Sequence, residues 1–193
     1  MAPSLTPLSP DERRLLLRVA RDSIRAVVLG EPAAEPDGLT PALEAVGAVF
    51  VSLHHDGALR GCIGSLAADQ PLYRAVARAA EAAALEDPRF PPVGLSELPG
   101  LEIEISRLSA LVPVSPDAVL PGEHGVSLQW SGRRAVFLPQ VAPKYGWDRE
   151  TLLRELCAKA HLPPDAWRYP EAQVSVFVAE VFSDADENEA TAE

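Results

Sequence analysis

The sequence predicts a protein in which helices are mixed with antiparallel strands. Two stretches have the pattern of a β-hairpin, and each is followed by a helix with an apolar stripe and then by a single strand. Hydrophobic residues make up 47% of the 193 residues and charged residues 23%, a balance that supports a folded core. At about 150 residues per domain, this length favours one compact unit or two lobes that share an interface.

The charge of the chain limits the partners that it suits. Its formal net charge is −11, and such a surface repels phosphate backbones unless its basic residues gather in one place. The largest basic clusters in the sequence are the pairs Arg13-Arg14 and Arg133-Arg134. No apolar run approaches the roughly 18 residues that a membrane span needs. We therefore expect no binding to nucleic acid and no membrane segment.

The sequence also predicts where the folded part begins and ends. We expect residues 1–8 to be flexible, residues 9–182 to form the domain, and residues 183–193, which are acidic and lack Lys and Arg, to be a disordered tail. Cys62 and Cys157 are too few for a disulfide framework, and the first residues do not have the pattern of a secretory signal. A reducing, cytoplasmic location fits these features.

The first predicted element is a helix that starts after Ser9. Pro10 suits the first helical position, and Glu12 stands where it completes a capping box with Ser9. Apolar residues then recur on one face until Gly30, which is a typical helix end. The Pro- and Gly-containing residues 31–38 are predicted to form a loop.

A hairpin follows a short helical turn at Thr40-Pro41. Residues 47–55 and 58–64 are predicted strands, and Asp56-Gly57 between them is a strong signal for a two-residue turn. The hairpin therefore places two antiparallel strands side by side.

A second helix and a strand complete the first half. Asp69 is predicted to cap a helix that reaches Glu86, because Pro88 prevents its continuation. Residues 87–92 hold three prolines and are predicted to form a stiff loop, and strict alternation over residues 101–108 predicts a half-buried strand.

The second half repeats this order of elements. A hairpin is predicted over residues 126–138 with its turn at Ser131-Gly132, a helix is predicted after Asp148, and an apolar strand is predicted over residues 174–182. We offer an internal duplication of hairpin, helix and strand as a hypothesis. A different strand order in the two halves would refute it.

The first hairpin offers the clearest chemistry. In a regular hairpin Val51 faces Cys62, so that Arg60 and Cys62 project from the same side of one strand, about 7 Å apart. Gly61 and Gly64 flank the cysteine, and glycine inside a strand is expected where a backbone or a ligand comes close. These residues predict a reactive or ligand-contacting thiol beside a guanidinium. The alternative is that Cys62 is a small buried apolar residue.

Four other side chains bear on the chemistry of the thiol. His54 is predicted on the opposite sheet face, and His55 about 13 Å along the strand, so neither reaches Cys62 without a bulge. His124, between two glycines at the mouth of the second hairpin, is the candidate base, with a solvated turn histidine as the alternative. Glu104 is a candidate acid or base, with an ordinary exposed carboxylate as the alternative.

Other kinds of site have little support. The chain has no Cys-x-x-Cys pair, no His-x-x-x-His pair and no glycine-rich phosphate loop, so no metal site is predicted and no motif points to a cofactor. Cys157 lies on the apolar stripe of its helix and is predicted to be core.

Several motifs in register resemble a known family. The resemblance runs over roughly residues 10 to 182, and the motifs that carry it are Leu59-Arg60-Gly61-Cys62-Ile63-Gly64, Asp87-Pro88-Arg89-Phe90-Pro91-Pro92, Glu104-Ile105-Ser106, Glu123-His124-Gly125-Val126, Phe137-Leu138-Pro139-Gln140-Val141, Gly146-Trp147-Asp148 and Leu156-Cys157-Ala158-Lys159-Ala160. On these residues the chain resembles the AMMECR domain family, whose prokaryotic members are called AmmeMemoRadiSam system protein A. His161 departs from the pattern, which has glycine there.

The resemblance implies a fold and a set of partners. The implied fold is α+β, with two lobes built on antiparallel sheets flanked by helices and with the motif residues near an interlobe cleft. The implied partners are a Memo-type protein and a radical S-adenosylmethionine protein. The resemblance does not supply a reaction.

Two functional hypotheses follow. In the first, the protein handles a substrate: Cys62 is the reactive or ligand-contacting group, Arg60 and Arg89 bind an anionic group, Gly61 and Gly64 let the ligand approach, and a base acts among His124, Glu104 and Asp87. In the second, the protein is a non-catalytic module that docks on the Memo-type partner through rigid loops such as residues 87–92.

Overall fold

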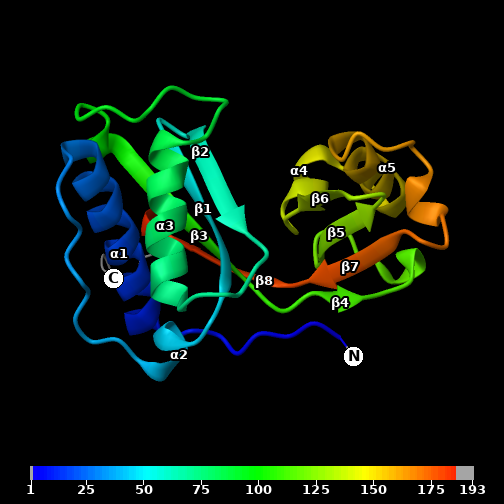
Figure 1. Cartoon of the computed structure of the whole chain (residues 1–193), viewed down its shortest axis with the longest axis horizontal. Coiled ribbons are helices and arrows are strands. Elements are labelled where there is room, and N and C mark those ends of the chain that lie inside the picture. The colour runs from blue at the N-terminus through cyan, green and yellow to red at the C-terminus, as the bar shows by residue number, and fades with distance from the viewer. Residues whose placement is uncertain (1, 186–193) are drawn as a thin grey trace. The chain divides into compact units, whose positions relative to one another are not determined.

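In the computed structural model, which describes residues 2–185, the chain forms two units (Figure 1). The first unit contains residues 6–108 and 180–185, and the second contains residues 2–5 and 109–179. Each unit has its own four-stranded sheet with helices packed on it. The α+β class expected from the sequence is confirmed.

The first unit has the strand order β2-β1-β3-β8. Its elements are α1 (Pro10–Leu29), α2 (Pro41–Glu44), β1 (Ala48–His55), β2 (Ala58–Ser65), α3 (Leu72–Leu85), the 3-10 turn η1 (Leu98–Gly100), β3 (Leu101–Leu108) and β8 (Ala179–Ser183).

One face of this sheet forms the core of the first unit. Val51, Leu53, Ile103 and Ile105 are almost completely buried in a cluster that includes residues of α1 and α3. The two helices lie side by side over that face (Figure 1). Strand residues that alternate with the core set therefore project from the face that α1 and α3 leave uncovered.

The helix boundaries have local causes. The capping box between Ser9 and Glu12 is present, and Gly30 ends α1 in the left-handed conformation at φ 71°. The cap predicted at Asp69 is wrong. Helix α3 starts at Leu72 after Pro71 and has no side-chain cap, because the Leu72 N–H donates to the carbonyl of Ala45 in the preceding segment.

The second unit has the strand order β4-β7-β5-β6. Its elements are β4 (Val112–Pro113), the 3-10 turn η2 (Pro116–Ala118), β5 (Gly125–Trp130), β6 (Arg133–Phe137), α4 (Val141–Tyr145), α5 (Arg149–Lys159), the 3-10 turn η3 (Ala166–Arg168) and β7 (Gln173–Phe177).

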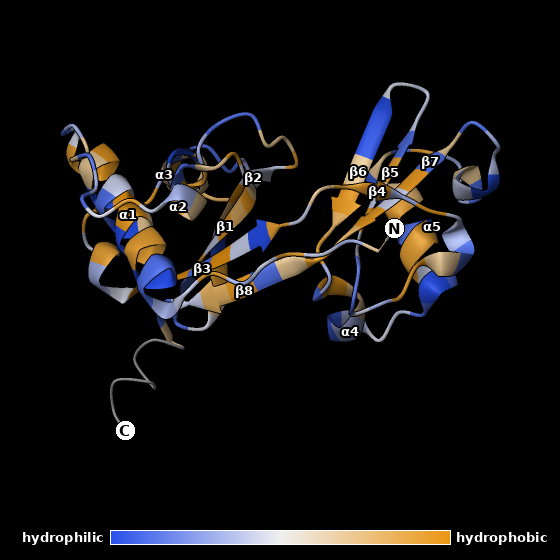
Figure 2. Ribbon diagram, turned by 90° about the horizontal axis from the view of Figure 1, so that it is seen from below, coloured by the Kyte–Doolittle hydropathy of each residue, from blue (hydrophilic) through white to orange (hydrophobic). Residues whose placement is uncertain are grey.

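The core of the second unit joins the sheet to α5. Strand β6 begins polar and ends apolar, as Figure 2 shows, and Leu128 and Val176 are fully buried with Leu156 of α5. Cys157 is also fully buried in this cluster, as predicted. Burial raises the pKa of the Cys157 thiol, because the charged form would lose its hydration.

The two sheets share a strand order. The hairpin and the later strand lie in the order β2-β1-β3 in the first unit and β6-β5-β7 in the second, so the outcome that would refute the duplication hypothesis does not occur. Both hairpins also turn through two residues with positive φ, Asp56-Gly57 and Ser131-Gly132.

The chain ends show where the first unit closes. Leu8 is buried and its N–H donates to the Glu180 carboxylate at 3.0 Å, so contacts begin before the predicted boundary at Ser9. Asp184 forms an ion pair with Arg21. Most of the predicted disordered tail, residues 186–193, lies outside the described residues. No helix within residues 2–185 combines the length and the apolarity that crossing a membrane requires.

Candidate functional site

A β-bulge changes the expected geometry of the first hairpin. His54 pairs with Leu59, but Leu53 pairs with Gly61, so Arg60 is an extra residue in β2. The pairing predicted between Val51 and Cys62 is therefore wrong by one residue, because that prediction assumed a regular ladder.

The shifted register places Cys62 at the end of a polar row. Cys62 lies opposite Ser52 of β1, and Ser52 lies opposite Glu104 of β3. The Ser52 hydroxyl donates to the Cys62 sulfur at 3.3 Å. His54 stands two residues from Ser52 on the same face, so the prediction that it lies on the opposite face from Cys62 is also corrected. The row projects from the sheet face that α1 and α3 leave uncovered.

The main chain of Cys62 is held by Asp87 from the loop after α3. β2 is an edge strand, and the Cys62 N–H lies on its outer side, where it donates to the Asp87 carboxylate at 2.8 Å. The Asp87 side chain is only 2% exposed. The two carboxylate oxygens also accept from Arg89, at 2.9 Å from Nε and 2.6 Å from Nη2. Asp87 thus fixes the position of the cysteine on the strand.

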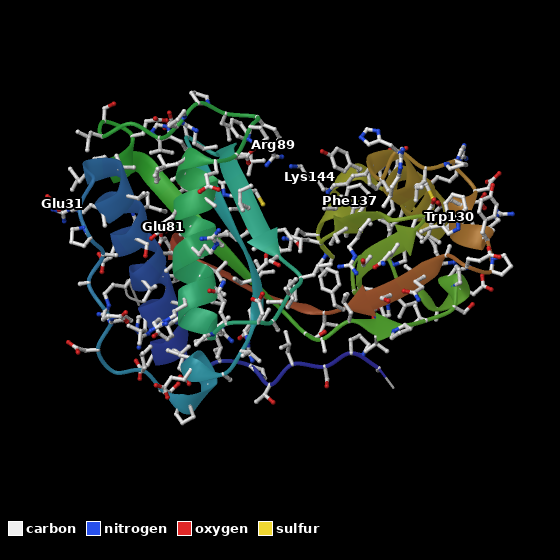
Figure 3. The ribbon with its side chains drawn as sticks, viewed as in Figure 1. Glu31, Glu81, Arg89, Trp130, Phe137 and Lys144 are labelled. Atoms are coloured by element: carbon white, nitrogen blue, oxygen red, sulfur yellow. The ribbon has the colours of Figure 1, made fainter. Side chains whose placement is uncertain are left out.

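Arg89 completes this clamp and remains partly open to ligands. Its hydrogen bonds hold the pKa of the Asp87 carboxyl well below the usual range, with a further contribution from the Cys62 N–H. Arg89 Nη2 also lies 3.5 Å from the Cys62 carbonyl oxygen. The side chain is 55% exposed and stands beside β2 (Figure 3).

Arg60 forms an ion pair with Glu97, a residue that the sequence analysis did not identify. Its Nε and Nη2 donate to the Glu97 carboxylate at 2.7 and 3.1 Å, and its side chain is 13% exposed. This pairing, helped by the Gly94 N–H, lowers the pKa of Glu97 to about 2. The prediction that the Arg60 guanidinium acts beside the thiol is therefore corrected, because its positive charge is paired with the Glu97 carboxylate.

The two glycines have a packing explanation. A Cβ atom on Gly61 would lie 2.2 Å from the carbonyl oxygen of Ala83 in α3, and one on Gly64 would lie 2.4 Å from the ring of Phe50. Close approach of a backbone and a ring is therefore enough to require glycine at both positions.

The remaining candidates fall in different units. Glu104 is part of the polar row in the first unit. His124 belongs to the second unit, where its Nδ1 accepts the Leu120 N–H at 3.2 Å, which leaves the proton of a neutral ring on Nε2. The first unit thus brings together Cys62, Glu104, Asp87 and Arg89, and His124 has a local partner of its own.

Sequence reasoning missed Ser52 and Glu97. A regular ladder pairs Cys62 with Val51, so it gave no indication of Ser52 as a neighbour. Gly61 inside the strand was the available signal of a bulge. Glu97 is 37 residues from Arg60, and no local pattern connects two residues so far apart.

Comparisons with other proteins cover nearly the whole chain. The model of the AMMECR1 family matches residues 17–182. A protein of Methanothermobacter thermautotrophicus is 39% identical over 184 residues, which span 91% of this chain and 96% of that protein. A protein of Thermococcus gammatolerans is 39% identical over 182 residues. The crystal structure of the uncharacterized protein PH0010 from Pyrococcus horikoshii matches with a TM-score of 0.82 and 36% identity, covering 87% of this chain and 89% of that one.

Proposed function

This chain belongs to the AMMECR1 family, and from that premise we propose that Cys62 is the reactive or ligand-contacting group of a substrate-handling site on the face of the first sheet opposite α1 and α3. One observation carries the proposal. The Cys62 N–H is held by Asp87 and its carbonyl oxygen is approached by Arg89, while its sulfur projects beside the Ser52 hydroxyl. Fixing a reacting atom in advance removes an entropic cost from the reaction.

The neighbours of the sulfur suit a reaction that develops negative charge. The Ser52 hydroxyl supplies a donor to sulfur, and a donor already in place stabilises such charge as it forms. Arg89 Nη1 has no hydrogen bond within the described residues, so it is free to donate to an anionic ligand. Glu104 stands on the far side of Ser52 as a proton acceptor. We further propose that the protein works with the Memo-type protein and the radical S-adenosylmethionine protein.

Alkylation tests the state of the thiol, with Cys157 as the internal reference. We expect iodoacetamide near neutral pH to modify Cys62 at least on the order of 100-fold faster than Cys157, because Cys157 reacts only after its unit opens. Peptide mass spectrometry separates the two sites. Equal and slow modification of both would remove the thiol from the mechanism.

A reconstituted system tests whether the thiol is needed. If the Cys62→Ser variant keeps its fold, we expect it to abolish the activity that the protein supports with its two partners, and Cys157→Ser to retain it. Full activity of a folded Cys62→Ser variant would contradict a chemical role.

A non-catalytic docking module is the second candidate, and one observation favours it. The loop that follows α3 is locked by Asp87, and it presents Arg89 with its guanidinium 5.3 Å from the ring centroid of Phe90. An exposed, rigid arginine and aromatic pair is typical of interface anchors. Calorimetric titration with the Memo-type protein discriminates the two: binding that survives Cys62→Ser and is lost in Arg89→Ala supports the module.

A further inference from the structure

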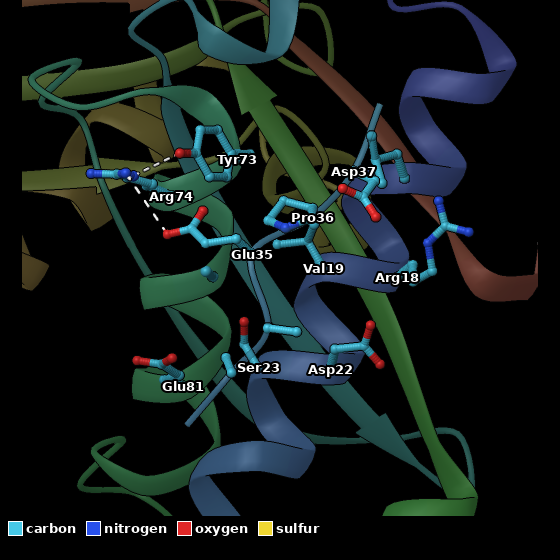
Figure 4. A pocket seen from close by; sticks show the side chains of 14 residues that line it. Arg18, Val19, Asp22, Ser23, Glu35, Pro36, Asp37, Tyr73, Arg74 and Glu81 are labelled. Carbon is cyan, nitrogen blue, oxygen red and sulfur yellow. Dashed lines mark hydrogen bonds and ion pairs between the residues drawn. The ribbon is translucent and has the colours of Figure 1, made fainter. Parts of the chain in front are cut away.

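A cavity lies on the helical side of the first unit, away from the Cys62 site. It has a volume of about 400 Å³ and opens between α1, α3 and the loop at residues 33–37 (Figure 4). This volume is within the range of small-molecule sites. None of its lining residues belongs to the polar row or to the clamp around Cys62.

The two helices line the cavity in successive turns. Both run in the same direction (Figure 1), and each contributes residues four apart in sequence, which is about one turn or 6 Å. These residues are Leu15, Val19 and Ser23 of α1, and Tyr73, Ala77 and Glu81 of α3. The cavity wall is therefore apolar in the middle and polar towards Ser23 and Glu81.

The polar end contains a serine that is largely buried and whose hydroxyl faces the cavity without a partner in the described part of the chain. Ser23 is 3% exposed and its side chain lines the cavity (Figure 4). Within residues 2–185, neither the Ser23 hydroxyl nor the half-buried Glu81 carboxylate has a hydrogen-bond or ion-pair partner. Among the described residues, the completely buried side-chain atoms without a partner are Arg60 Nη1 and Trp167 Nε1. The Ser23 oxygen is not one of them, so it is accessible from the cavity and can form a hydrogen bond with a ligand there. The Glu81 carboxylate only accepts hydrogen bonds and a hydroxyl can also accept one, so a ligand that donates to both groups suits this end of the cavity.

The charges around the cavity identify the kind of donor. Four carboxylates line it, from Asp22, Glu35, Asp37 and Glu81, against two guanidinium groups. One of the two, that of Arg74, is bound at 2.8 Å to the Tyr73 hydroxyl and lies 3.9 Å from Glu35. A cation is therefore the favoured ligand.

The cavity suits an organic cation better than a metal ion. Among the described residues, no three His, Cys, Asp or Glu side chains gather closely enough to hold a metal. The middle of the cavity is lined by Val19, Ala77 and Pro36, which match a methylene chain. Glu35 and Asp37, on the loop, stand apart from Ser23 and Glu81 (Figure 4), and this separation matches a ligand that is charged at both ends.

We propose that this cavity binds an aliphatic amine, with diamines preferred. One ammonium group donates to the Ser23 hydroxyl and to the Glu81 carboxylate, and the methylene chain lies along Val19 and Ala77. The second ammonium reaches the carboxylates of the loop. An ammonium carries three donors and no acceptor, which satisfies the unpaired groups at the polar end.

Calorimetry on the full chain at 0.15 M salt tests the proposal with three probes of one length: 1,4-diaminobutane, 1-aminobutane and 1-butanol. We expect the diamine to bind most tightly, the monoamine several-fold more weakly, and the alcohol not at all. Glu81→Gln should weaken diamine binding about 10-fold or more, and Ser23→Ala about 3- to 10-fold, since each removes a charge-assisted hydrogen bond. Glu155→Gln, on α5 of the second unit, makes the same charge change elsewhere and should leave the dissociation constant within about 2-fold.

Several results would overturn the proposal. Absence of binding to the wild-type chain means that the cavity holds only water, and equal binding of 1-butanol means that the site is merely apolar. Equal weakening by Glu155→Gln would reveal diffuse attraction to an acidic protein. Amide chemical shifts of the wild-type chain provide an independent readout: diamine should move the signals of Val19, Ser23 and Glu81, and shifts confined to other residues would refute the site.

Discussion

The two units carry the same strand arrangement and different chemistry. Aligned on their hairpin turns, the row Cys62–Ser52–Glu104 of the first unit corresponds to the row Val136–Ser127–Ser175 of the second. The serine in the middle is common to both rows. The thiol and the carboxylate occur only in the first, together with the bulge at Arg60. The shared scaffold therefore presents three side chains on one sheet face, and the first unit uses that place for chemistry.

The two edge strands extend this comparison. The Val136 carbonyl accepts from Lys159 Nζ at 2.8 Å, and the Cys62 carbonyl lies 3.5 Å from Arg89 Nη2. In both units a cation from the end of the helix, or just beyond it, thus approaches the edge strand. The first unit differs in having a carboxylate there as well: Asp87 accepts a hydrogen bond from the Cys62 N–H. Asp87 consequently distinguishes a fixed strand position from an ordinary edge contact.

The largest expected effect concerns Gly61 and its counterpart Ala135. Gly61→Ala should lower the free energy of unfolding by about 3 kcal/mol, because the new methyl group would meet the Ala83 carbonyl oxygen at 2.2 Å. Ala135→Gly should cost about 1 kcal/mol, from one buried methyl group and backbone entropy. Urea unfolding followed by circular dichroism measures both. Equal losses would mean that the two hairpins pack alike.

The next effect concerns Asp87. Asp87→Asn should cost about 2 kcal/mol at pH 7, because it removes a buried charge that accepts from Arg89 and from the Cys62 N–H. Asp148→Asn in the second unit should change little, because asparagine also caps a helix. Unfolding at neutral pH compares the two variants.

The acid dependence of stability checks the same clamp. The pKa of Asp87 is lower in the folded than in the unfolded state, so its contribution is complete above the unfolded pKa of about 3.9 and is lost as the pH falls below it. Asp87→Asn should flatten the fall in stability below pH 4. The loss of stability in acid that persists in this variant should include the contribution of Glu97, whose pKa in the folded protein is about 2. An unchanged acid profile would show that Asp87 does not stabilise the fold as a charged group.

A smaller difference is expected between the cysteines. Cys157→Ser should cost about 2 kcal/mol, because it places a hydroxyl in a fully buried apolar cluster. Cys62→Ser should cost less than about 0.5 kcal/mol, because Cys62 is partly exposed and already has a hydroxyl neighbour. Thermal unfolding of both variants tests this order, and its reversal would contradict the placement of Cys62 on the polar row.

The smallest effect compares the ends of α1 and α5. Both helices are followed by a left-handed residue, Gly30 at φ 71° and His161 at φ 53°. His161 thus adopts the backbone conformation that favours glycine. His161→Gly should stabilise the second unit by about 0.5 to 1 kcal/mol. A loss of stability would mean that the imidazole makes a compensating contact.

The elements of the fold were largely predictable because their signals are local. The capping box at Ser9, the left-handed end at Gly30 and the turn at Asp56-Gly57 each depend on residues within one turn. The bulge at Arg60 was not predictable in the same way, because a regular ladder fits the same residues. A shift of one residue then exchanged the cross-strand partner of Cys62 and moved His54 to its face.

The site was predictable only in part. Cys62, Asp87 and Arg89 were identified from the motifs, and the structure connects them by hydrogen bonds. The hydrogen bond from Ser52 depends on the register, and the pairing of Arg60 with Glu97 depends on the path of the loop after α3. Both are tertiary features without a sequence period.

The clamp at Cys62 also bears on association between chains. An edge strand with free N–H and C=O groups is a template on which another strand can assemble. The outward N–H of Cys62 is bound by Asp87, and the guanidinium of Arg89 stands over its carbonyl. The same two side chains that hold the thiol in place therefore occupy the outward main-chain groups of Cys62, and a second strand could pair with β2 at this residue only by displacing them.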